Sequence, residues 1–509
     1  MDQEYTANII PITPSRENHV NSTQSQDVDV LVLGAGIAGI SAAWHFAHHL
    51  PSLNIAVLEG RSEIGGTWSL FRYPGVRCDS DMYTLGFSFA PWTGREAIVD
   101  GDVILQYLKD VVAQENLERL IRFDHRVREA RWSSQTSRWT LQVDTPTGCQ
   151  TITCSFLMVC TGYYRYDGGY LPDFSGIDSF PGPVIHPQEW PDDFAFAGKR
   201  VALIGSGATA MTLAPRLADT ASHVSVVQRS PSYVISRPQR DRIANLLLRW
   251  LPRKVALPVI RAKNISLMTF SLYLARQAPQ RMGEAIIDRA KRELPAGYDS
   301  ETHFRPRYKI WDNRLCLIRN GDLFQSIGRG DVTMVTGEIE RFTEDGLLLT
   351  SGDHVPADIV VAATGFHMRL FGGIEFFRDD EPIDFSSTVC YKGMMLDGVP
   401  NFAFTVGYQA ATYTLKADIV SRYVSRLLGH LFDNGISSVT PHLNDESVDL
   451  EPFTGYRPGY VQRVLADLPR QGSKPPWRLS MNYYRDMWMA RAQPVEDINL
   501  HFARRRTGT

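Results

Sequence analysis

Two glycine-rich loops have the residue types and spacing needed to bind the phosphates of a dinucleotide. The first, at residues 34–39, reads G-x-G-x-x-G. Gly34 permits a tight turn, Gly36 lets the backbone approach a pyrophosphate, and Gly39 lets a helix pack closely on a strand. Glu59 follows about twenty residues later, where a carboxylate can accept hydrogen bonds from an adenosine ribose. The pattern predicts a dinucleotide site; a glycine-rich turn without a ligand is the alternative.

The second loop, at residues 205–210, has the same form but ends in Ala210. The strand expected after it, at residues 223–228, leads into Arg229 and Ser230 instead of an acid. A carboxylate there would repel a 2′-phosphate, whereas a guanidinium and a hydroxyl would bind one by charge-assisted hydrogen bonds. This unit therefore favours NADPH. An exposed arginine without a ligand is the alternative.

Two longer motifs lie between the loops. Residues 65–79 read G-G-x-W-x-x-x-x-Y-P-G-x-x-x-D, and residues 180–191 read F-x-G-x-x-x-H-x-x-x-W-P. In the first motif the glycines permit close backbone approach to a ligand, and Trp68 offers a flat apolar wall. A core tryptophan beside a structural turn would explain Trp68 alone. Two long motifs in this order are hard to attribute to chance.

Together these motifs resemble the signatures of the type I Baeyer–Villiger monooxygenases, flavoenzymes that use NADPH and O2 to insert one oxygen atom into a substrate. Shorter matches, at residues 79–87, 91–95 and 310–316, resemble more narrowly the ethionamide-activating monooxygenase subfamily. The resemblance extends from about Val28 to Ala503. It implies FAD at the first loop, NADPH at the second, and oxygen transfer through a C4a-peroxyflavin.

The resemblance also implies two catalytic residues. The active-site arginine of the family falls on Arg314, and Asp79 matches the carboxylate that pairs with that arginine and aims it. A permanently protonated guanidinium suits both a peroxide anion and the negative adduct formed on a carbonyl. Many members have lysine before the arginine, where this chain has Asn313. Arg229 and Ser230 must then carry more of the selectivity for NADPH.

Two residues of the second motif carry further expectations. The family suggests that His186 links domains, and a buried, hydrogen-bonded histidine is the alternative, so no proton transfer is assigned to it. Trp190 favours carbonyl insertion, because flavin monooxygenases that oxygenate nitrogen usually have tyrosine or phenylalanine there. The predicted cofactor-binding residues are Gly34, Ala35, Gly36, Gly39, Glu59, Gly66, Thr67, Trp68, Asp79, Val127, Gly205, Ser206, Gly207, Ala208, Thr209, Ala210, Arg229 and Ser230. No metal site is assigned.

The elements that must position these residues predict an α/β fold, with two Rossmann-like dinucleotide-binding domains (FAD and NADPH) and a helical insertion. Apolar runs at residues 156–160 and 357–363 each lead into Thr-Gly, as where flavin monooxygenases cross between domains. The run at residues 400–407 is expected to complete the FAD sheet. The predicted parts are a mobile tail at 1–26, the FAD domain at 27–163 and 367–509 with the C-terminal segment, and the NADPH domain at 164–366, with the insertion at about 240–300.

The insertion is open to two interpretations. Residues 240–292 are helical in pattern and contain twelve Lys or Arg but three acids. The helices could pack on the NADPH domain with their basic residues on the wet face, which is favoured because charge runs usually mark solvated faces. They could instead form an amphipathic surface that touches an anionic membrane and receives apolar substrate.

Composition agrees with an enzyme of two or three domains. The 509 residues carry a formal net charge of −3, which predicts no nucleic-acid partner. No uncharged apolar run approaches the roughly 20 residues of a membrane span, although peripheral contact remains open. The polar N-terminus resembles neither a signal peptide nor a transit sequence. Oligomeric state cannot be inferred.

The six cysteines are scattered, which fits reduced thiols and a cytoplasmic location. Cys149 and Cys154 have the spacing of a redox pair in flavin disulfide reductases. They lie in a β-patterned stretch far from the segment after Glu59, where such a pair belongs, and we interpret them as structural.

The predicted reaction is oxygen insertion into small apolar ketones to give esters or lactones, together with S-oxygenation of thioethers and thiocarbonyls. One alternative is an N- or S-oxygenating flavin monooxygenase without carbonyl insertion. Another is a flavin-dependent reductase or disulfide oxidoreductase without oxygen chemistry.

Overall fold

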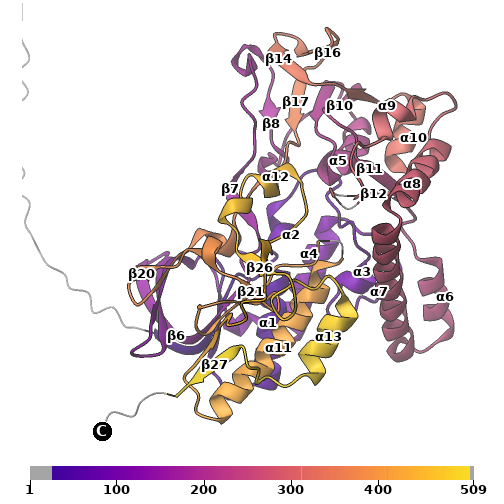
Figure 1. Cartoon of the computed structure of the whole chain (residues 1–509). Helices are drawn as coiled ribbons and strands as arrows, with labels where there is room; N and C mark the ends of the chain where they lie inside the picture. Colours follow the sequence, from indigo (N-terminus) through magenta and orange to yellow (C-terminus); the bar gives the residue numbers. More distant parts are fainter. Residues whose placement is uncertain (1–25, 311, 314, 410, 505–509) are drawn as a thin grey trace, which may run out of the picture.

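The computed structural model describes residues 26–504, apart from 311, 314 and 410. Two separate β-sheets organise these residues (Figure 1). The tail predicted at 1–26 lies outside the described residues except for Gln26, which begins the first strand, β1 (Gln26–Leu33). The α/β fold with two Rossmann-like units and a helical insertion is confirmed; the exact domain boundaries stay a prediction.

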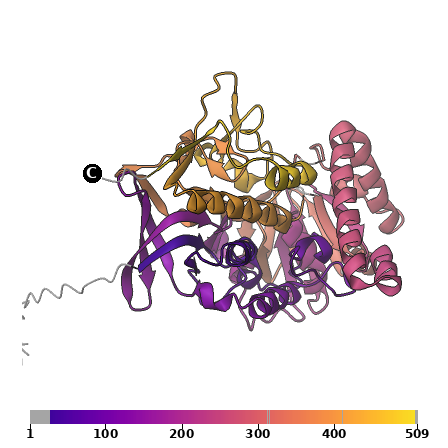
Figure 2. The ribbon, with the colours of Figure 1, turned by 90° about the horizontal axis from the view of Figure 1, so that it is seen from below.

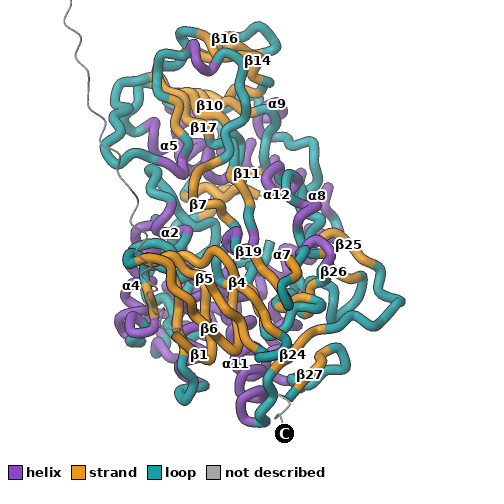
Figure 3. The backbone as a smooth tube through the Cα atoms, turned by 90° about the vertical axis from the view of Figure 1, so that its left-hand side faces the viewer, coloured by secondary structure: helices purple, strands orange, loops and turns teal. Residues whose placement is uncertain are grey.

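The larger sheet joins a parallel part to an antiparallel part. Its strands β4, β5, β6 and β1 lie side by side in Figure 3. Its strands run in the order β20-β19-β4-β5-β6-β1-β2-β3, and β23 also pairs with β6. In addition to β1, the sheet contains β2 (Ile55–Leu58), β3 (Ile121–Arg122), β4 (Arg126–Ser133), β5 (Arg138–Thr145), β6 (Gly148–Val159), β19 (Glu375–Arg378), β20 (Glu381–Pro382) and β23 (Phe402–Phe404).

Strand β6 belongs to both parts, and its sequence changes along its length. Residues 148–154 pair antiparallel with β5, and burial alternates over residues 151–155. Residues 156–159 are all apolar and buried, because there β6 lies between the parallel strands β1 and β23. The strand predicted within residues 400–407 is thus present as β23 at the edge of the parallel part.

One face of the parallel part is covered by helices. Helix α1 (Ile37–His49) and α11 (Tyr413–Asp433) pack against each other, and α13 (Tyr483–Ala492) lies beside α11 (Figure 1). Their buried apolar side chains form one core with α4 (Gly101–Gln114) and with the helix-facing residues of β1, β2 and β6. This core fixes the N-terminal end of α1, where the first glycine loop ends.

The second sheet is entirely parallel, in the order β13-β10-β9-β17-β8. Its elements are β8 (Val184–Ile185), β9 (Arg200–Ile204), α5 (Ala208–Ala218), β10 (His223–Gln228), α10 (Asp322–Arg329), β13 (Val332–Thr336) and β17 (Ile359–Ala362). The strand–loop–helix–strand run β9-α5-β10 repeats the run β1-α1-β2 of the first sheet. The sequence therefore builds two equivalent loops on two sheets.

Two short strands connect the sheets. β7 (Tyr164–Gly169) and β18 (Phe366–Met368) pair antiparallel, and each begins within two residues of one of the Thr-Gly turns. His186 packs over β7, where a Cβ on Gly169 would lie 1.9 Å from its ring. Its Nε2–H donates to the Gly365 carbonyl at 2.7 Å, while its Nδ1 accepts from the Gln188 N–H. The histidine thus ties the second motif to the crossing between the sheets.

The predicted insertion is helical. It contains α6 (Arg242–Trp250), α7 (Arg253–Gln277) and α8 (Pro279–Glu293), which stand at one side of the molecule (Figure 2). The Asp241 carboxylate caps α6 by accepting from the Ala244 N–H, and Pro252 and Pro279 separate the three helices. α8 packs on β11 (Tyr233–Arg237), which pairs with β12 (Leu315–Arg319).

Smaller elements complete the fold. They are α2 (Thr67–Leu70), α3 (Met82–Leu85), α9 (Ser300–Phe304), α12 (Gly459–Gln462), β14 (Ile339–Thr343), β15 (Gly346–Leu349), β16 (His354–Pro356), β21 (Cys390–Tyr391), β22 (Met395–Leu396), β24 (Ser438–Pro441), β25 (Leu450–Pro452), β26 (Arg470–Gly472) and β27 (Leu500–Ala503), with 3-10 turns at Glu118–Leu120, Ile177–Ser179, Pro187–Glu189, Leu370–Gly373, Phe385–Ser387 and Leu465–Asp467.

Candidate functional site

The first glycine loop has the shape that its sequence predicts. Gly34 has a φ of +98°, and a Cβ there would lie 2.7 Å from the Cys160 carbonyl oxygen. A Cβ on Gly39 would lie 1.8 Å from the Gly34 carbonyl oxygen, so only glycine lets α1 sit this close. By contrast, a Cβ on Gly36 would make only ordinary contact, 3.6 Å from Gly66. The fold itself therefore does not demand glycine at position 36, whereas a ligand phosphate would.

Glu59 lies at the end of β2 and faces this loop. Its Oε2 accepts from the Ala35 N–H at 2.7 Å, and its Oε1 accepts from the Arg61 N–H at 3.0 Å. Burial raises the pKa of this carboxyl above its usual range, although the two backbone donors act in the opposite direction. Each oxygen keeps acceptor capacity that two ribose hydroxyls could use.

The second loop repeats this geometry. Gly205 has a φ of +137°, and a Cβ there would lie 2.4 Å from the Ala363 carbonyl oxygen. Ala210, which stands where the first loop has Gly39, is fully buried in the core of the second unit. A Cβ on Gly207 would meet no atom within 4 Å, so the backbone there faces open space. That open face fits a phosphate approaching the N-terminus of α5.

The end of β10 differs from the end of β2. Arg229 and Ser230 are exposed, and Arg229 makes no hydrogen bond or ion pair with another described residue. A guanidinium that faces a cavity without a protein partner is available to an anionic ligand.

Both loops open onto a single cavity of about 2100 Å³. Predicted residues that line it are Gly34, Gly36, Glu59, Gly66, Thr67, Trp68, Asp79, Val127, Gly205, Ser206, Gly207, Ala208, Thr209, Arg229 and Ser230. The predicted residues Ala35, Gly39 and Ala210 do not line it; their contribution is to shape the loops. Arg314 lies outside the described residues, while Asn313 before it lines the cavity.

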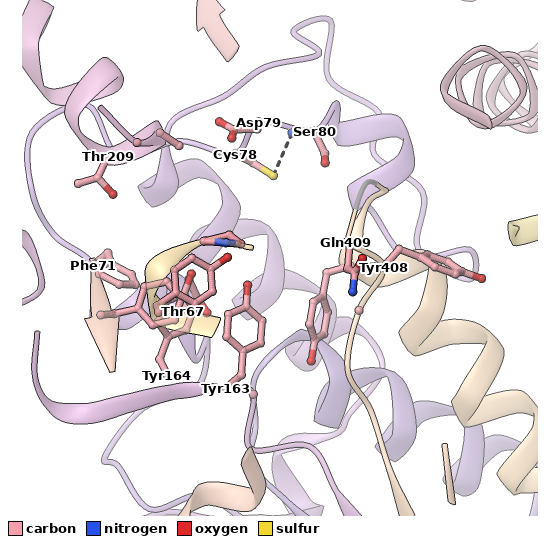
Figure 4. Close-up of a pocket in the computed structure, with 18 of the residues that line it drawn as sticks. Thr67, Phe71, Cys78, Asp79, Ser80, Tyr163, Tyr164, Thr209, Tyr408 and Gln409 are labelled. Carbon is pink, nitrogen blue, oxygen red and sulfur yellow. Dashed lines mark hydrogen bonds between the residues drawn. The ribbon is translucent and has the colours of Figure 1, made fainter. Parts of the chain in front are cut away.

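The first motif supplies a wall of the cavity between the two loops. Asp79, Cys78 and Ser80 lie on one turn of chain, where the Ser80 N–H donates to the Cys78 sulfur at 3.3 Å (Figure 4). Burial raises the pKa of the Cys78 thiol to about 12, so this cysteine stays protonated and unreactive near neutral pH. Asp79 is therefore the anionic side chain among these three residues, and Asp81 lines the cavity just beyond it.

The second motif has a structural role in this molecule. Trp190 packs edge-on against Phe194 and Phe196 and does not line the cavity. His186 lines it, but both of its ring nitrogens are engaged with backbone groups, and burial lowers its pKa. Neither residue is placed to transfer a proton.

Sequence reasoning missed part of the cavity wall. Tyr163 and Tyr164 follow the first Thr-Gly turn, and Tyr408 and Gln409 follow β23; all four line the cavity and are labelled in Figure 4. Tyr408 donates to the Asp486 carboxylate at 2.7 Å, which ties this wall to α13. Their position gives the missing signal, because ligands in α/β folds bind beyond the carboxyl ends of the strands.

The cysteine pair is not a redox centre. Cys149 is exposed, Cys154 is buried on the same strand, and both are free thiols. An odd separation of five residues puts the two side chains on opposite faces of β6. The interpretation of this pair as structural agrees with the fold.

A strand–loop–helix unit on each side of one cavity is the arrangement of a protein class that binds two dinucleotides. The family model "Flavin-binding monooxygenase-like" matches residues 96–380, and that of a NAD(P)-binding Rossmann-like domain matches residues 32–93. FAD-containing monooxygenase EthA of Mycobacterium tuberculosis is 50% identical over 483 residues, which cover 94% of this chain and 99% of that protein. The chain therefore belongs to the flavin-binding monooxygenase-like family.

Two solved structures share the fold over 94% of this chain and 100% of theirs. "Oxidized steroid monooxygenase bound to NADP" superposes with a TM-score of 0.73 at 23% identity. Cyclohexanone monooxygenase, in an epsilon-caprolactone-bound crystal structure, superposes with a TM-score of 0.72 at 20% identity. The prediction of a flavin-dependent monooxygenase is confirmed, and the alternative of a reductase or disulfide oxidoreductase is dismissed.

Proposed function

We propose that this monooxygenase holds FAD at residues 34–39 and NADPH at residues 205–210, and inserts oxygen from O2 into apolar ketones to give esters or lactones. The same site would S-oxygenate thioethers and thiocarbonyls. The observation that carries the proposal is the single cavity shared by both glycine loops. A nicotinamide and a flavin must come together in one space for hydride transfer, and this arrangement provides it.

The loops and their flanking residues would divide the binding task. Gly36 and Gly207 leave room for the two pyrophosphates at the N-termini of α1 and α5. Glu59 would accept from the ribose hydroxyls of FAD, while Arg229 and Ser230 would bind the 2′-phosphate of NADPH. The flavin, when bound, supplies the reaction with O2; the protein must exclude water and stabilise negative charge.

Arg314 and Asp79 are the proposed catalytic residues. Arg314 is assigned by its position in the motif. Asn313, the residue before it, and Asp79 both line the cavity, which supports this assignment. The guanidinium would hold the negative charge that develops on oxygen during attack at a carbonyl, and Asp79 would orient it. A cation that cannot lose its proton performs this role across the working pH range.

The wall of the cavity on the insertion side supports an apolar substrate. Leu267, Met268, Phe270 and Leu274 of α7 line it, and Met481 faces it from the C-terminal segment. Steroid and cyclohexanone monooxygenases share this fold, and epsilon-caprolactone, held by the latter, is a cyclic ester. These likenesses support carbonyl insertion as the reaction. The six free thiols support the cytoplasmic location in this proposal.

Product analysis tests the proposal. The holoenzyme is incubated under air with NADPH and, in turn, linear, cyclic and aryl ketones and the matching thioethers, with hydrogen peroxide measured in each reaction. Esters or lactones formed in proportion to NADPH consumed would support it. Sulfoxides without any ester would instead establish the N- or S-oxygenating alternative. NADPH consumption that yields only hydrogen peroxide with every ketone would refute carbonyl insertion.

A further inference from the structure

The insertion exposes an unusual amount of apolar surface. Large apolar side chains on α6 and α7 face solvent, and Trp250 is 72% exposed. Here we call them the insertion face: Ile243, Leu246, Trp250, Leu251, Val255, Val259, Leu267, Phe270, Tyr273 and Leu274. Single exposed apolar residues are ordinary, but a contiguous group of this kind marks a binding surface.

Several exposed positions of α7 form one stripe. They recur three or four residues apart, which places them along one side of a helix. The stripe runs through Val255, Val259, Ala262, Ser266, Phe270 and Tyr273, with Tyr484 of α13 hydrogen bonded to Ser266 at its middle, whereas Ala256, Ile260, Ile265, Leu272 and Ala275 are buried. The opposite side of the helix is already used for packing, so the stripe cannot be covered by rotating α7.

Buried contacts hold α7 in this orientation. The Arg261 guanidinium donates to the carbonyls of Tyr83 and Gly86 at 3.0 and 2.6 Å and lies 3.6 Å from the Asp418 carboxylate. Lys263 pairs with Asp241 at the start of α6. Arg261 thus points toward the body of the protein and Lys263 toward α6, and these contacts fix the rotation of α7 about its own axis.

The charge on the insertion face has one sign. Residues 242–277 contain no Asp or Glu, although the whole chain has more acids than Lys and Arg. Five cations in this stretch are exposed and form no ion pair with any described residue: Arg242, Arg249, Arg253, Lys254 and Arg276. Exposed helices that only face water usually carry both signs.

We propose that the insertion face docks on an anionic lipid bilayer. Helices that lie in a membrane interface combine apolar residues with Lys and Arg, and these two features coincide on α6 and α7. No helix among the described residues is long and apolar enough to cross a membrane, so the contact is peripheral. A second copy of this chain offers the face no opposite charge, because a symmetric contact would place the same cations together.

The cavity opens at this face. Ile243, Leu267, Phe270 and Leu274 are exposed members of the insertion face, and they also line the cavity. An apolar molecule dissolved in the bilayer would thus meet apolar side chains from the membrane surface to the interior. This route rests on the proposed function, whereas the docking itself does not.

Vesicle co-sedimentation of the FAD-loaded enzyme tests the docking without turnover. Vesicles of phosphatidylcholine alone are compared with vesicles that also contain phosphatidylglycerol, at increasing salt. We expect binding that requires the anionic lipid and declines as salt rises. Reversing Arg249, Arg253 and Lys254 to Glu should weaken binding at least about a hundredfold, since each cation near the surface contributes roughly fivefold. Trp250→Ser should weaken it about tenfold.

Matched controls keep the test specific. The triple variant Arg119→Glu, Lys199→Glu, Arg341→Glu reverses three exposed cations elsewhere, and Ile498→Ser removes an apolar side chain that is 93% exposed. Both controls should bind vesicles as the wild type does.

The proposal is overturned if the enzyme does not bind anionic vesicles, or if controls and insertion-face variants lose binding equally. It is also overturned if the insertion-face variants abolish self-association in solution while vesicle binding is absent, because the face is then an interface between copies. Ketone oxygenation in detergent solution is independent of each result.

Discussion

The two glycine-loop units have the same backbone plan but opposite chemistry at the end of their second strand. In both, the first glycine has a positive φ and presses against a carbonyl that precedes a Thr-Gly turn, Cys160 in one and Ala363 in the other. Yet β2 ends in a buried carboxylate held by two backbone N–H groups, whereas β10 ends in an exposed guanidinium without a described partner.

This difference separates what the fold needs from what a ligand needs. Glu59 is integrated into the structure of its own loop, so its role in binding and its role in stability are mixed. Arg229 contributes nothing visible to the fold. Changes at the second unit should therefore alter cofactor choice cleanly, while changes at the first should alter stability as well.

The largest effect is expected where neither unit is touched. Arg314→Ala should leave both cofactors bound but slow ketone oxygenation about a hundredfold to a thousandfold, because removal of a charged stabiliser from a dry site costs ~3–4 kcal/mol of barrier. Sulfoxidation, which builds up no negative charge on a carbonyl oxygen, should suffer less. Initial rates and bound FAD are measured together.

Two variants complete this test. Asp79→Asn should slow the reaction in the same direction by leaving the arginine without its orienting charge. Arg307→Ala, which removes an exposed arginine that does not line the cavity, serves as the control. Ketone conversion near the wild-type rate by an Arg314→Ala enzyme with its full FAD content would show that the proposed catalytic role is wrong.

Arg229→Glu is the next largest change and isolates the second unit. Loss of one or two charge-assisted hydrogen bonds, worth ~1.5–3 kcal/mol each, should raise the KM for NADPH tenfold or more. The KM for NADH should change little, because NADH lacks the 2′-phosphate. Arg341→Glu, outside the cavity, should alter neither value. An unchanged preference for NADPH over NADH in Arg229→Glu would show that Arg229 does not bind the 2′-phosphate.

The glycines of the second loop should separate folding from binding. Gly205→Ala forces a side chain into a positive φ and toward the Ala363 carbonyl, so it should lower the free energy of unfolding by about 1–3 kcal/mol. Gly207→Ala adds a Cβ to open space and should cost less than about 1 kcal/mol in stability. It should nevertheless weaken NADPH binding roughly tenfold by crowding the phosphate. Denaturant unfolding and NADPH titration are compared; equal stability loss in both variants would contradict this division.

These contrasts explain what the sequence could and could not predict. Glycine spacing and strand-end charges are local, so both loops, Glu59 and Arg229 could be placed from the sequence. The walls formed by Tyr164 and Tyr408 could not, because they depend on how distant segments meet around the cavity.

The insertion shows the same limit. Its helices follow from local sequence, and its basic residues other than Arg261 and Lys263 are exposed, as the favoured interpretation expects. The exposure of Trp250 and Phe270 beside them depends on which side of α6 and α7 the body of the protein covers. Periodicity gives the faces of a helix but not which of them is buried.

The smallest effect should come from Glu59→Gln, which tests the mixed role of the first unit. Burial raises the pKa of Glu59 above 4.5 in the folded state. The folded protein therefore binds this proton more tightly than the unfolded chain, and the resulting stability is present below pH 4.5 and lost as pH rises through the raised pKa. Without FAD, the difference in Tm between Glu59→Gln and wild type should thus shift in favour of the variant as pH rises from acid to neutral.

With FAD bound, the wild type should have the higher Tm at neutral pH, since ribose hydroxyls bond a carboxylate more strongly than an amide. FAD affinity should fall about tenfold in the variant. Glu63→Gln, which alters a nearby carboxylate that does not line the cavity, should show neither behaviour. If Glu59→Gln binds FAD as tightly as wild type at neutral pH, the carboxylate only stabilises the loop. The two strand ends would then differ in role, with Glu59 structural and Arg229 binding the cofactor.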